Sequence, residues 1–150
     1  MATIRAQDVF NIIDTEAPKY GVDPEFAKAI LAAENSASGS LDPSAALSLQ
    51  AVSKRGAFGL GQIMPATRAS LISMGAVPAD IKDNTALGQV QLMLATLKQQ
   101  RAQTGGDPVL DAVYYNSGTA ALEAAKAGDL TRLPQETQAY LGKVGNKFKL

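Results

Sequence analysis

Glu34 is a residue whose type and placement could do acid and base chemistry. It follows the run AILAA and shares a helical face with Ile30 and Leu31, at offsets of four and three, an apolar position for a carboxylate. Burial there favours the protonated form. A carboxylic acid that stays neutral near neutral pH can protonate a glycosidic oxygen, and the resulting carboxylate can then accept a proton back. The alternative is that Glu34 is a solvated charge at a helix end.

The segment SKRGAFGLGQIMP, residues 53–65, could bring polar groups next to a ligand. Its three glycines allow the backbone to lie close to a bound molecule. Gln62 offers both a donor and an acceptor to sugar amides and hydroxyls, and Met64 lies beside it. The alternative, which this segment alone favours, is a glycine-rich turn that enters a helix at Pro65.

Two further groups of residues lie toward the C-terminus. Tyr115 and Asn116 are placed at a predicted helix end, where a tyrosine presents an apolar face and a hydroxyl together, as carbohydrate sites often require. Glu136 follows Pro134 in the first turn of the last predicted helix, with Tyr140 four residues later. Each group also has an ordinary explanation, because asparagine is common in turns and an acid in a first turn interacts favourably with the helix dipole.

Helices are the elements that must position these residues. Helical start and stop residues recur along the chain, whereas alternating strand patterns and hairpin turn pairs are missing, so we predict an all-α fold with little or no sheet. Residues 35–55 are predicted to form an ordered loop with one short helical turn. The expected helices are a first one containing Ile4 and ended by Pro18 and Gly21, one over 24–34, one over 65–71, a longer one capped by Asn84 with Leu87 on its apolar spacing, one from 108 toward 115, one over 119–127 and a last one from 134.

The composition excludes several classes of chemistry. A length of 150 residues fits one domain, spanning 1–150, that can bury its core without disulfides or metal. Fourteen basic residues balance fourteen acidic ones, so no positive field exists to hold nucleic acid. The absence of histidine and cysteine removes the usual zinc, iron–sulfur and thiol sites, and the Ser-His and Cys-His nucleophiles. We therefore expect no cofactor and no metal, and chemistry carried by carboxylates, hydroxyls and amides.

In order and combination these pieces resemble the lysozyme-like catalytic domain of the soluble lytic transglycosylase family. Four segments carry the resemblance over about residues 20–146: AILAAENS, AVSKRGAFGLGQIMPAT, YNSG and LPQETQAYLGKV. The resemblance implies a single compact helical domain with a glycan-binding cleft, and it implies that Glu34 is the acid and base. It further implies that Ser53, Gln62 and Met64 line the cleft near the scissile bond, that Tyr115 contacts Glu34 or the substrate, that Asn116 shapes the same turn, and that Glu136 and Tyr140 brace the cleft, Glu136 as a structural partner.

The sequence departs from the family pattern at three places. Asn35 follows the catalytic glutamate where a serine is usual, so a hydrogen bond expected from that hydroxyl must come from Asn35 or be lost. Gly61 replaces the methionine of GLMQ, which opens that wall of the cleft. The loop between Glu34 and Ser53 is longer than usual, so the grip on the substrate there is expected to differ.

The reaction implied by the resemblance is non-hydrolytic cleavage of peptidoglycan glycan strands. Glu34 protonates the bond between N-acetylmuramic acid and N-acetylglucosamine, the neighbouring acetamido oxygen stabilises the developing charge, and the muramic 6-hydroxyl closes a 1,6-anhydro ring. This route needs no second carboxylate, unlike an ordinary glycosidase. One alternative is a hydrolytic muramidase on the same fold with Asp42 as second acid. The other is a non-catalytic wall-binding or virion structural protein, against which intact Glu34 and Gln62 argue.

The sequence also carries expectations about location. No stretch approaches the roughly 18 to 20 apolar residues of a membrane span. The N-terminal segment lacks the uninterrupted apolar region of a signal peptide, because Asp8, Asn11, Asp14 and Glu16 are scattered through it. We expect a protein made in the cytoplasm that acts on the cell wall, delivered by a virion or secretion apparatus as phage enzymes are.

Overall fold

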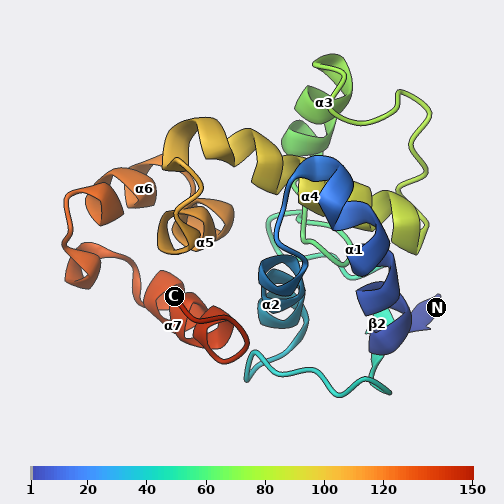
Figure 1. Cartoon of the computed structure of the whole chain (residues 1–150), viewed down its shortest axis with the longest axis horizontal. Helices are drawn as coiled ribbons and strands as arrows, with labels where there is room; N and C mark the ends of the chain where they lie inside the picture. Colours follow the sequence, from blue (N-terminus) through green and yellow to red (C-terminus); the bar gives the residue numbers. More distant parts are fainter. Residues whose placement is uncertain (1) are drawn as a thin grey trace.

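The computed structural model describes residues 2–150, and its elements are helices apart from two short strands (Figure 1). The predicted all-α class with little sheet is therefore confirmed. Among the described residues, no helix is both long and apolar enough to cross a membrane. In chain order the elements are β1 (Thr3–Arg5), α1 (Ala6–Tyr20), α2 (Pro24–Asn35), β2 (Ala46–Ser48), α3 (Pro65–Ser73), α4 (Ala86–Thr104), α5 (Pro108–Ser117), α6 (Thr119–Lys126), the 3-10 helix η1 (Leu130–Arg132) and α7 (Gln135–Gly145).

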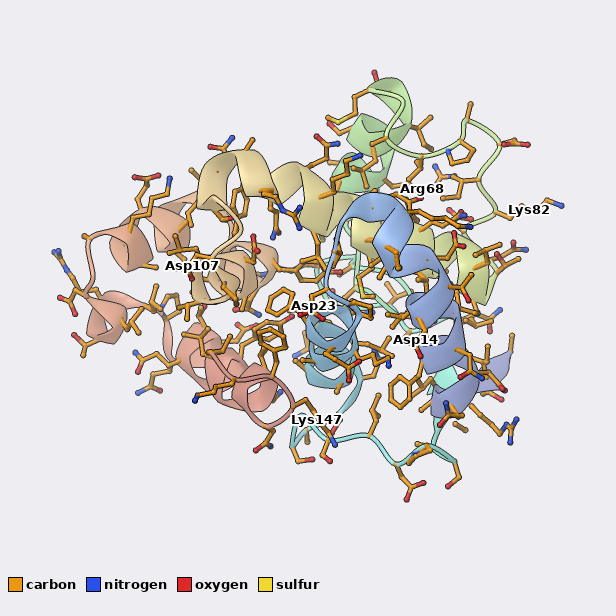
Figure 2. All side chains as sticks on the ribbon, viewed as in Figure 1. Asp14, Asp23, Arg68, Lys82, Asp107 and Lys147 are labelled. Carbon is orange, nitrogen blue, oxygen red and sulfur yellow. The ribbon has the colours of Figure 1, made fainter. Side chains whose placement is uncertain are left out.

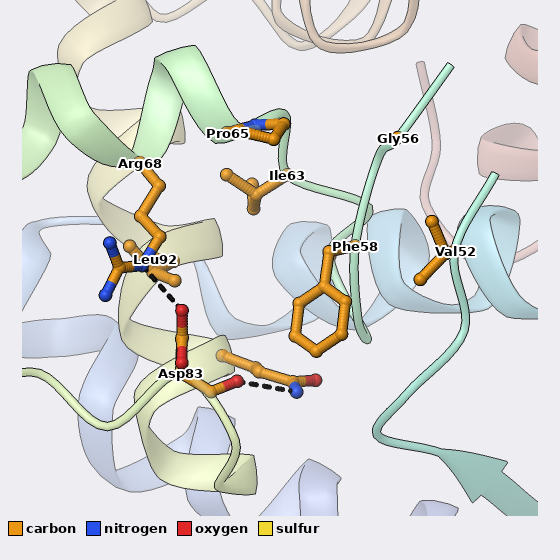
Figure 3. Close-up of a pocket in the computed structure, with 10 residues that line it drawn as sticks. Val52, Gly56, Phe58, Ile63, Pro65, Arg68, Asp83 and Leu92 are labelled. Carbon is orange, nitrogen blue, oxygen red and sulfur yellow. Dashed lines mark hydrogen bonds and ion pairs between the residues drawn. The ribbon is translucent and has the colours of Figure 1, made fainter. Parts of the chain in front are cut away.

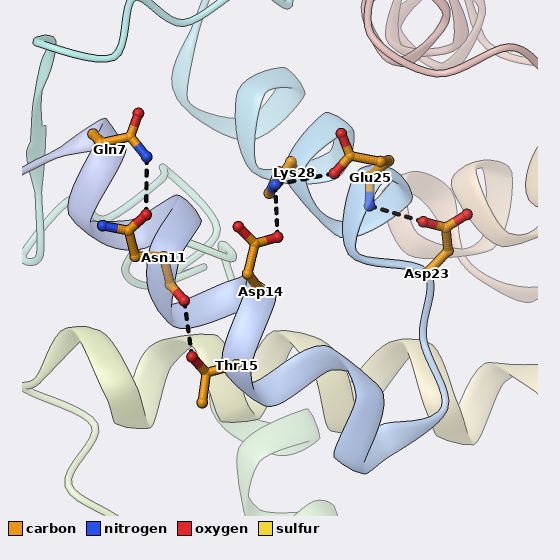
Figure 4. Close-up of polar contacts among 7 residues, drawn as sticks. All are labelled: Gln7, Asn11, Asp14, Thr15, Asp23, Glu25 and Lys28. Atoms are coloured by element: carbon orange, nitrogen blue, oxygen red, sulfur yellow. Dashed lines mark hydrogen bonds and ion pairs between the residues drawn. The ribbon is translucent and has the colours of Figure 1, made fainter.

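Helix α2 lies in the middle of the molecule, between α1 and α7 (Figure 1). It begins at the predicted cap, where the Asp23 carboxylate accepts a hydrogen bond from the Glu25 amide at 2.8 Å (Figure 4). Pro24 supplies the first-turn φ. Small side chains let the neighbouring helices approach closely, so that most of α2 is removed from solvent. Its buried residues are Phe26, Ala27, Ala29, Ile30, Leu31, Ala32 and Ala33.

Ion pairing on the surface supports the packing of α1 against α2. The Lys28 ammonium lies 2.7 Å from an Asp14 carboxylate oxygen on α1 and 3.0 Å from a Glu25 oxygen on its own helix (Figure 4). Partly exposed pairs of this kind contribute about 0 to 1 kcal/mol each. The association of the two helices is therefore held mainly by the apolar core between them, which contains Val9, Ile13 and Ile30.

The longest helix, α4, packs against α1, α3 and α5. It lies on the opposite side of the molecule from α7 (Figure 1). Its N-cap is Thr85, whose hydroxyl accepts the Gly88 amide at 3.1 Å, rather than the predicted Asn84. Leu87, which matched the helical spacing, is 47% exposed. Lys82 points outward from the loop that leads into α4 (Figure 2).

The predictions for the N-terminus and for residues 35–55 were wrong in two respects. Ile4 belongs to β1 instead of the first helix, and it pairs antiparallel with Leu47 of β2. No helical turn forms within 36–55; the loop contributes β2 to this two-stranded sheet instead. Three-residue strands are too short to show an alternating pattern, so no local pattern indicated them.

Candidate active site

Glu34 lies half-buried at the C-terminal end of α2, facing α7. The Tyr140 hydroxyl donates a hydrogen bond to its Oε2 at 2.7 Å. Burial raises the pKa of Glu34 to about 7; the Tyr140 hydroxyl and the Lys143 charge lower it, and the Glu136 charge raises it. A carboxyl with this pKa is present in both protonation states near neutral pH, as a group that must donate and accept a proton requires.

Tyr115 reaches the same region from α5. Its hydroxyl donates to the Gly61 carbonyl oxygen at 2.5 Å. Burial, and secondarily the nearby charge of Glu34, raise the pKa of Tyr115 well above 10, so the phenol stays protonated. The resemblance implied that Tyr115 contacts Glu34 or the substrate and that Tyr140 braces the cleft. In the structure the hydroxyl that contacts Glu34 is that of Tyr140.

Asn35 ties the end of α2 to the glycine-rich segment. Its side-chain amide donates to the Leu31 carbonyl at 2.8 Å and to the Leu60 carbonyl at 2.7 Å. The amide thus makes hydrogen bonds at the position where the family pattern has a serine hydroxyl. Because the second bond spans 25 positions of sequence, it fixes the segment around Leu60 next to Glu34.

Gln89 is a site-shaping residue that the sequence analysis missed. It is 2% exposed, and its Oε1 accepts the Leu60 amide at 2.8 Å. Its Nε2 donates to the carbonyls of Leu49 at 2.7 Å and Asp83 at 2.9 Å. A Cβ on Gly59 would lie 2.6 Å from the Gln89 Oε1, so glycine is required there for packing as well as for its φ of +77°. A polar residue within an apolar helical run was the only sequence sign of this role.

Gln62 takes part in the same segment, with an unusual backbone φ of +50°. Its side-chain amide donates to the Gly59 carbonyl at 2.9 Å and the Ala51 carbonyl at 3.2 Å. The predicted ligand-facing donor is therefore engaged within the turn. Ser53 is exposed, and its hydroxyl accepts the Ala57 amide at 3.0 Å.

Two hollows are lined by four of the eight predicted site residues. The first, open and about 480 Å³, has Glu34, Asn35 and Lys143 in its wall together with β2. The second, about 580 Å³, lies between α3, α4 and α5 and brings Met64, Tyr115 and Asn116 together. Its wall also includes amide and hydroxyl side chains: Thr67, Ser70, Thr96, Gln99, Gln100, Gln103 and Ser117. Such a wall of hydrogen-bonding groups beside aromatic and methionine surface suits a sugar chain.

A third cavity, about 340 Å³, lies beyond the glycine-rich segment (Figure 3). Val52, Phe58 and Ile63 give it apolar walls, and the Arg68 Nε lies 2.6 Å from Asp83 at one side. The predicted site residues do not line it. We therefore place the candidate active site in the first two hollows.

Glu136 and Asp42 lie outside the lining of both hollows. Glu136 is exposed, and it makes no hydrogen bond or ion pair within residues 2–150. The structure therefore shows no polar contact through which Glu136 would brace the cleft. Asp42 is exposed in the loop, where the hydroxyl and then the amide of Ser44 lower its pKa by hydrogen bonding to the carboxylate, at 2.6 and 2.8 Å.

Comparison with known proteins identifies the family and the fold of the chain. The sequence model of the transglycosylase SLT domain matches residues 11–137. No curated protein matches the chain. Among solved structures, the 70 kDa soluble lytic transglycosylase of Escherichia coli is similar with a TM-score of 0.61 and 20% identity, over 89% of this chain and 20% of that one. An inactive variant of the lytic transglycosylase Slt of Pseudomonas aeruginosa is similar with a TM-score of 0.67 and 21% identity, over 91% of this chain and 24% of that one. The chain thus spans about a fifth to a quarter of the length of these proteins, with which it shares the fold.

Proposed function

The chain belongs to the transglycosylase SLT domain family, and on that premise we propose that it is a peptidoglycan lytic transglycosylase with Glu34 as its one acid and base. The observation that carries the proposal is the state of Glu34: a half-buried carboxyl, with a pKa of about 7, in the wall of an open hollow. The resemblance of four sequence segments to the soluble lytic transglycosylase family is confirmed by the family match.

The first step is proton transfer from Glu34 to the bridging oxygen between N-acetylmuramic acid and N-acetylglucosamine. The Oε2 atom of Glu34 accepts the Tyr140 hydroxyl bond, so the Oε1 atom carries the transferable proton. The bond from muramic C1 to the bridging oxygen breaks, and N-acetylglucosamine leaves with the proton. The acetamido oxygen of the muramic residue stabilises the positive charge left at C1.

The second step regenerates the acid. Glu34, now a carboxylate, takes the proton of the muramic 6-hydroxyl, and the 6-oxygen bonds to C1 to close the 1,6-anhydro ring. No water is consumed, and Glu34 ends in its starting protonation state. The Tyr140 hydroxyl bond stabilises the carboxylate between the two steps, because it favours the charged form.

The charges around Glu34 support this route over hydrolysis. An inverting or retaining glycosidase uses two carboxylates on either side of the bond, about 5 to 10 Å apart. The titratable side chains in the wall of the first hollow are Glu34 and Lys143. Asp42, the second acid of the muramidase alternative, is exposed and bonded within its own turn.

We further propose that the second hollow holds sugars on one side of the scissile bond. Met64 and Tyr115 give apolar surface for sugar rings, and Asn116 and the glutamines of α4 give hydrogen bonds to hydroxyl and acetamido groups. Ser53 and the free acceptor of Gln62 would contact the substrate from the glycine-rich segment. Residues 1–150 would act as one domain.

Turnover of purified sacculi by Glu34→Gln tests the proposal. The amide keeps the shape of the acid and can still accept the Tyr140 hydroxyl bond, but it cannot supply the proton, so a loss of on the order of 10² to 10⁴-fold is expected. Glu123→Gln is the matched control, because its side chain is 67% exposed on α6. Near wild-type release of soluble fragments by folded Glu34→Gln would refute the assignment.

A further inference from the structure

Lys143 is a half-buried cation in the wall of the hollow that contains Glu34. It lies one helical turn after Tyr140 on α7, so the two side chains share the face of the helix that meets α2. Within residues 2–150 its ammonium makes no ion pair or hydrogen bond, although its charge acts on Glu34. Lys19 and Lys28 pair with carboxylates, whereas the other described lysines without an ion pair, unlike Lys143, are exposed.

The backbone at Lys143 is held in place by the extended loop after Glu34. A Cβ on Gly39 would lie 2.4 Å from the Lys143 carbonyl oxygen and 2.6 Å from its Cα, so the loop packs directly on α7 there. The side-chain amide of Asn146 donates to the Ser38 carbonyl at 2.5 Å one turn further on. The side chain of Lys143 therefore starts from a fixed backbone position in the wall of the hollow.

The charge in the hollow is positive when the enzyme is ready to react. The proton donor form of Glu34 is neutral, and Lys143 is the other titratable group in this wall. A neutral acid and an unpaired ammonium together favour an anionic ligand, because burying a cation without a partner is unfavourable.

We propose that Lys143 binds a carboxylate carried by the muramic residue at the scissile bond, and so selects strands with acidic substituents. This inference rests on the proposed function. The carboxylate has two sources, the peptide stem and the lactyl group, which is free when the stem is absent. Glycan strands without either group would gain nothing from Lys143.

Binding in the non-reacting Glu34→Gln background separates this role from catalysis. The dissociation constants of three strand preparations are measured by calorimetry at low and moderate salt: strands with acidic stems, the same strands with their carboxylates amidated, and strands freed of stems by an amidase. Each is compared in the background variant alone and with Lys143→Met, Lys143→Arg or Lys147→Met added. Lys147 is the matched control, because it is exposed just beyond the end of α7 and does not line the hollow (Figure 2).

Lys143→Met is expected to weaken binding of acidic strands about tenfold, as loss of one charge-assisted contact does, and to remove their salt dependence. Amidated strands should bind all variants alike, Lys143→Arg should retain most of the affinity, and Lys147→Met should match the background. Persistence of the loss on stem-free strands would identify the lactyl carboxylate, and its confinement to intact stems would identify the stem.

An equal loss on acidic and amidated strands, or no loss on any, would overturn the inference. Thermal melts of Lys143→Met exclude a folding effect, because the loop packs on the Lys143 backbone and not on its ammonium. Failure of the proposed function would show separately, as an absence of soluble fragments when the wild-type protein digests sacculi.

Discussion

Replacing Glu34 with glutamine should stabilise the protein at alkaline pH and leave its stability unchanged in acid. The pKa of this carboxyl is about 7 in the folded protein against an ordinary value of 4.5, chiefly because burial disfavours the charged form. At 1.36 kcal/mol for each pKa unit, ionising Glu34 costs the folded state on the order of 3 kcal/mol.

The sign follows from where the proton is bound. Between pH 4.5 and pH 7 the folded chain keeps a proton on Glu34 that the unfolded chain has released. Below pH 4.5 Glu34 thus takes almost nothing from the free energy of unfolding, and the loss grows as the pH rises toward and through 7. Glutamine has no charge to bury, so the advantage of the variant should be near zero at pH 4.5 and close to its full size at pH 8.

Thermal melts of wild type and Glu34→Gln at pH 4.5 and pH 8 measure this difference. For a domain of this size about 2 to 4 °C corresponds to each kcal/mol, so the variant should melt roughly 6 to 12 °C higher at pH 8. Glu123→Gln, a change at an exposed carboxylate, should give no such pH dependence. An offset for Glu34→Gln that is the same at both pH values would refute the claim that burial sets the pKa of Glu34.

Three further changes probe the groups around Glu34. Tyr140→Phe removes the hydrogen bond to the carboxylate, so kcat should fall and the alkaline limb of the pH–rate profile should move to higher pH, since that bond lowers the pKa of Glu34. Gly61→Ala places a Cβ 2.9 Å from the Tyr115 hydroxyl oxygen, so unfolding measurements should show a loss of about 1 to 3 kcal/mol. Glu136→Gln should change the free energy of unfolding by less than about 1 kcal/mol and move the alkaline limb to lower pH, because its charge raises the pKa of Glu34.

Each of these has a result that would contradict it. The Tyr140→Phe prediction is contradicted if the alkaline limb of the pH–rate profile stays in place or moves to lower pH. For Gly61→Ala the control is Gly142→Ala, where a Cβ meets nothing within 4 Å, and a loss of stability equal in both variants would remove the role of the close approach. For Glu136→Gln it is a fall in melting temperature as large as that of Gly61→Ala, which would restore the bracing role expected from the sequence.

The helices could be predicted because their boundaries are local. Pro24, Pro65 and Pro108 each begin a helix with the φ that proline favours. Asp23 adds a cap hydrogen bond, and Gly105 ends a helix in the left-handed conformation. The two strands could not be predicted, because each is three residues long and forms only by pairing with a segment about forty positions away. Their pairing is a tertiary contact that no local pattern encodes.

In the candidate site, too, features set by local sequence could be predicted and features set by tertiary contacts could not. The place of Glu34 at the end of a helix, on an apolar face that is partly buried, could be predicted because it follows from local sequence. The hydrogen bond from Tyr140 to Glu34 could not be predicted, because it depends on the packing of α2 against α7. Gln89 was missed for the same reason, since its partners lie in the segments around Leu49 and Leu60, far from it in sequence.

Mass analysis of soluble fragments from digested sacculi, before and after borohydride, tests the central claim most directly. Ring closure by the muramic 6-hydroxyl adds no water and leaves no reducing end. The account therefore predicts muramic ends that are lighter by one water than hydrolysis products and unchanged by borohydride. Reducible ends that carry the extra water would contradict it, and Asp42 would then become the first residue to mutate.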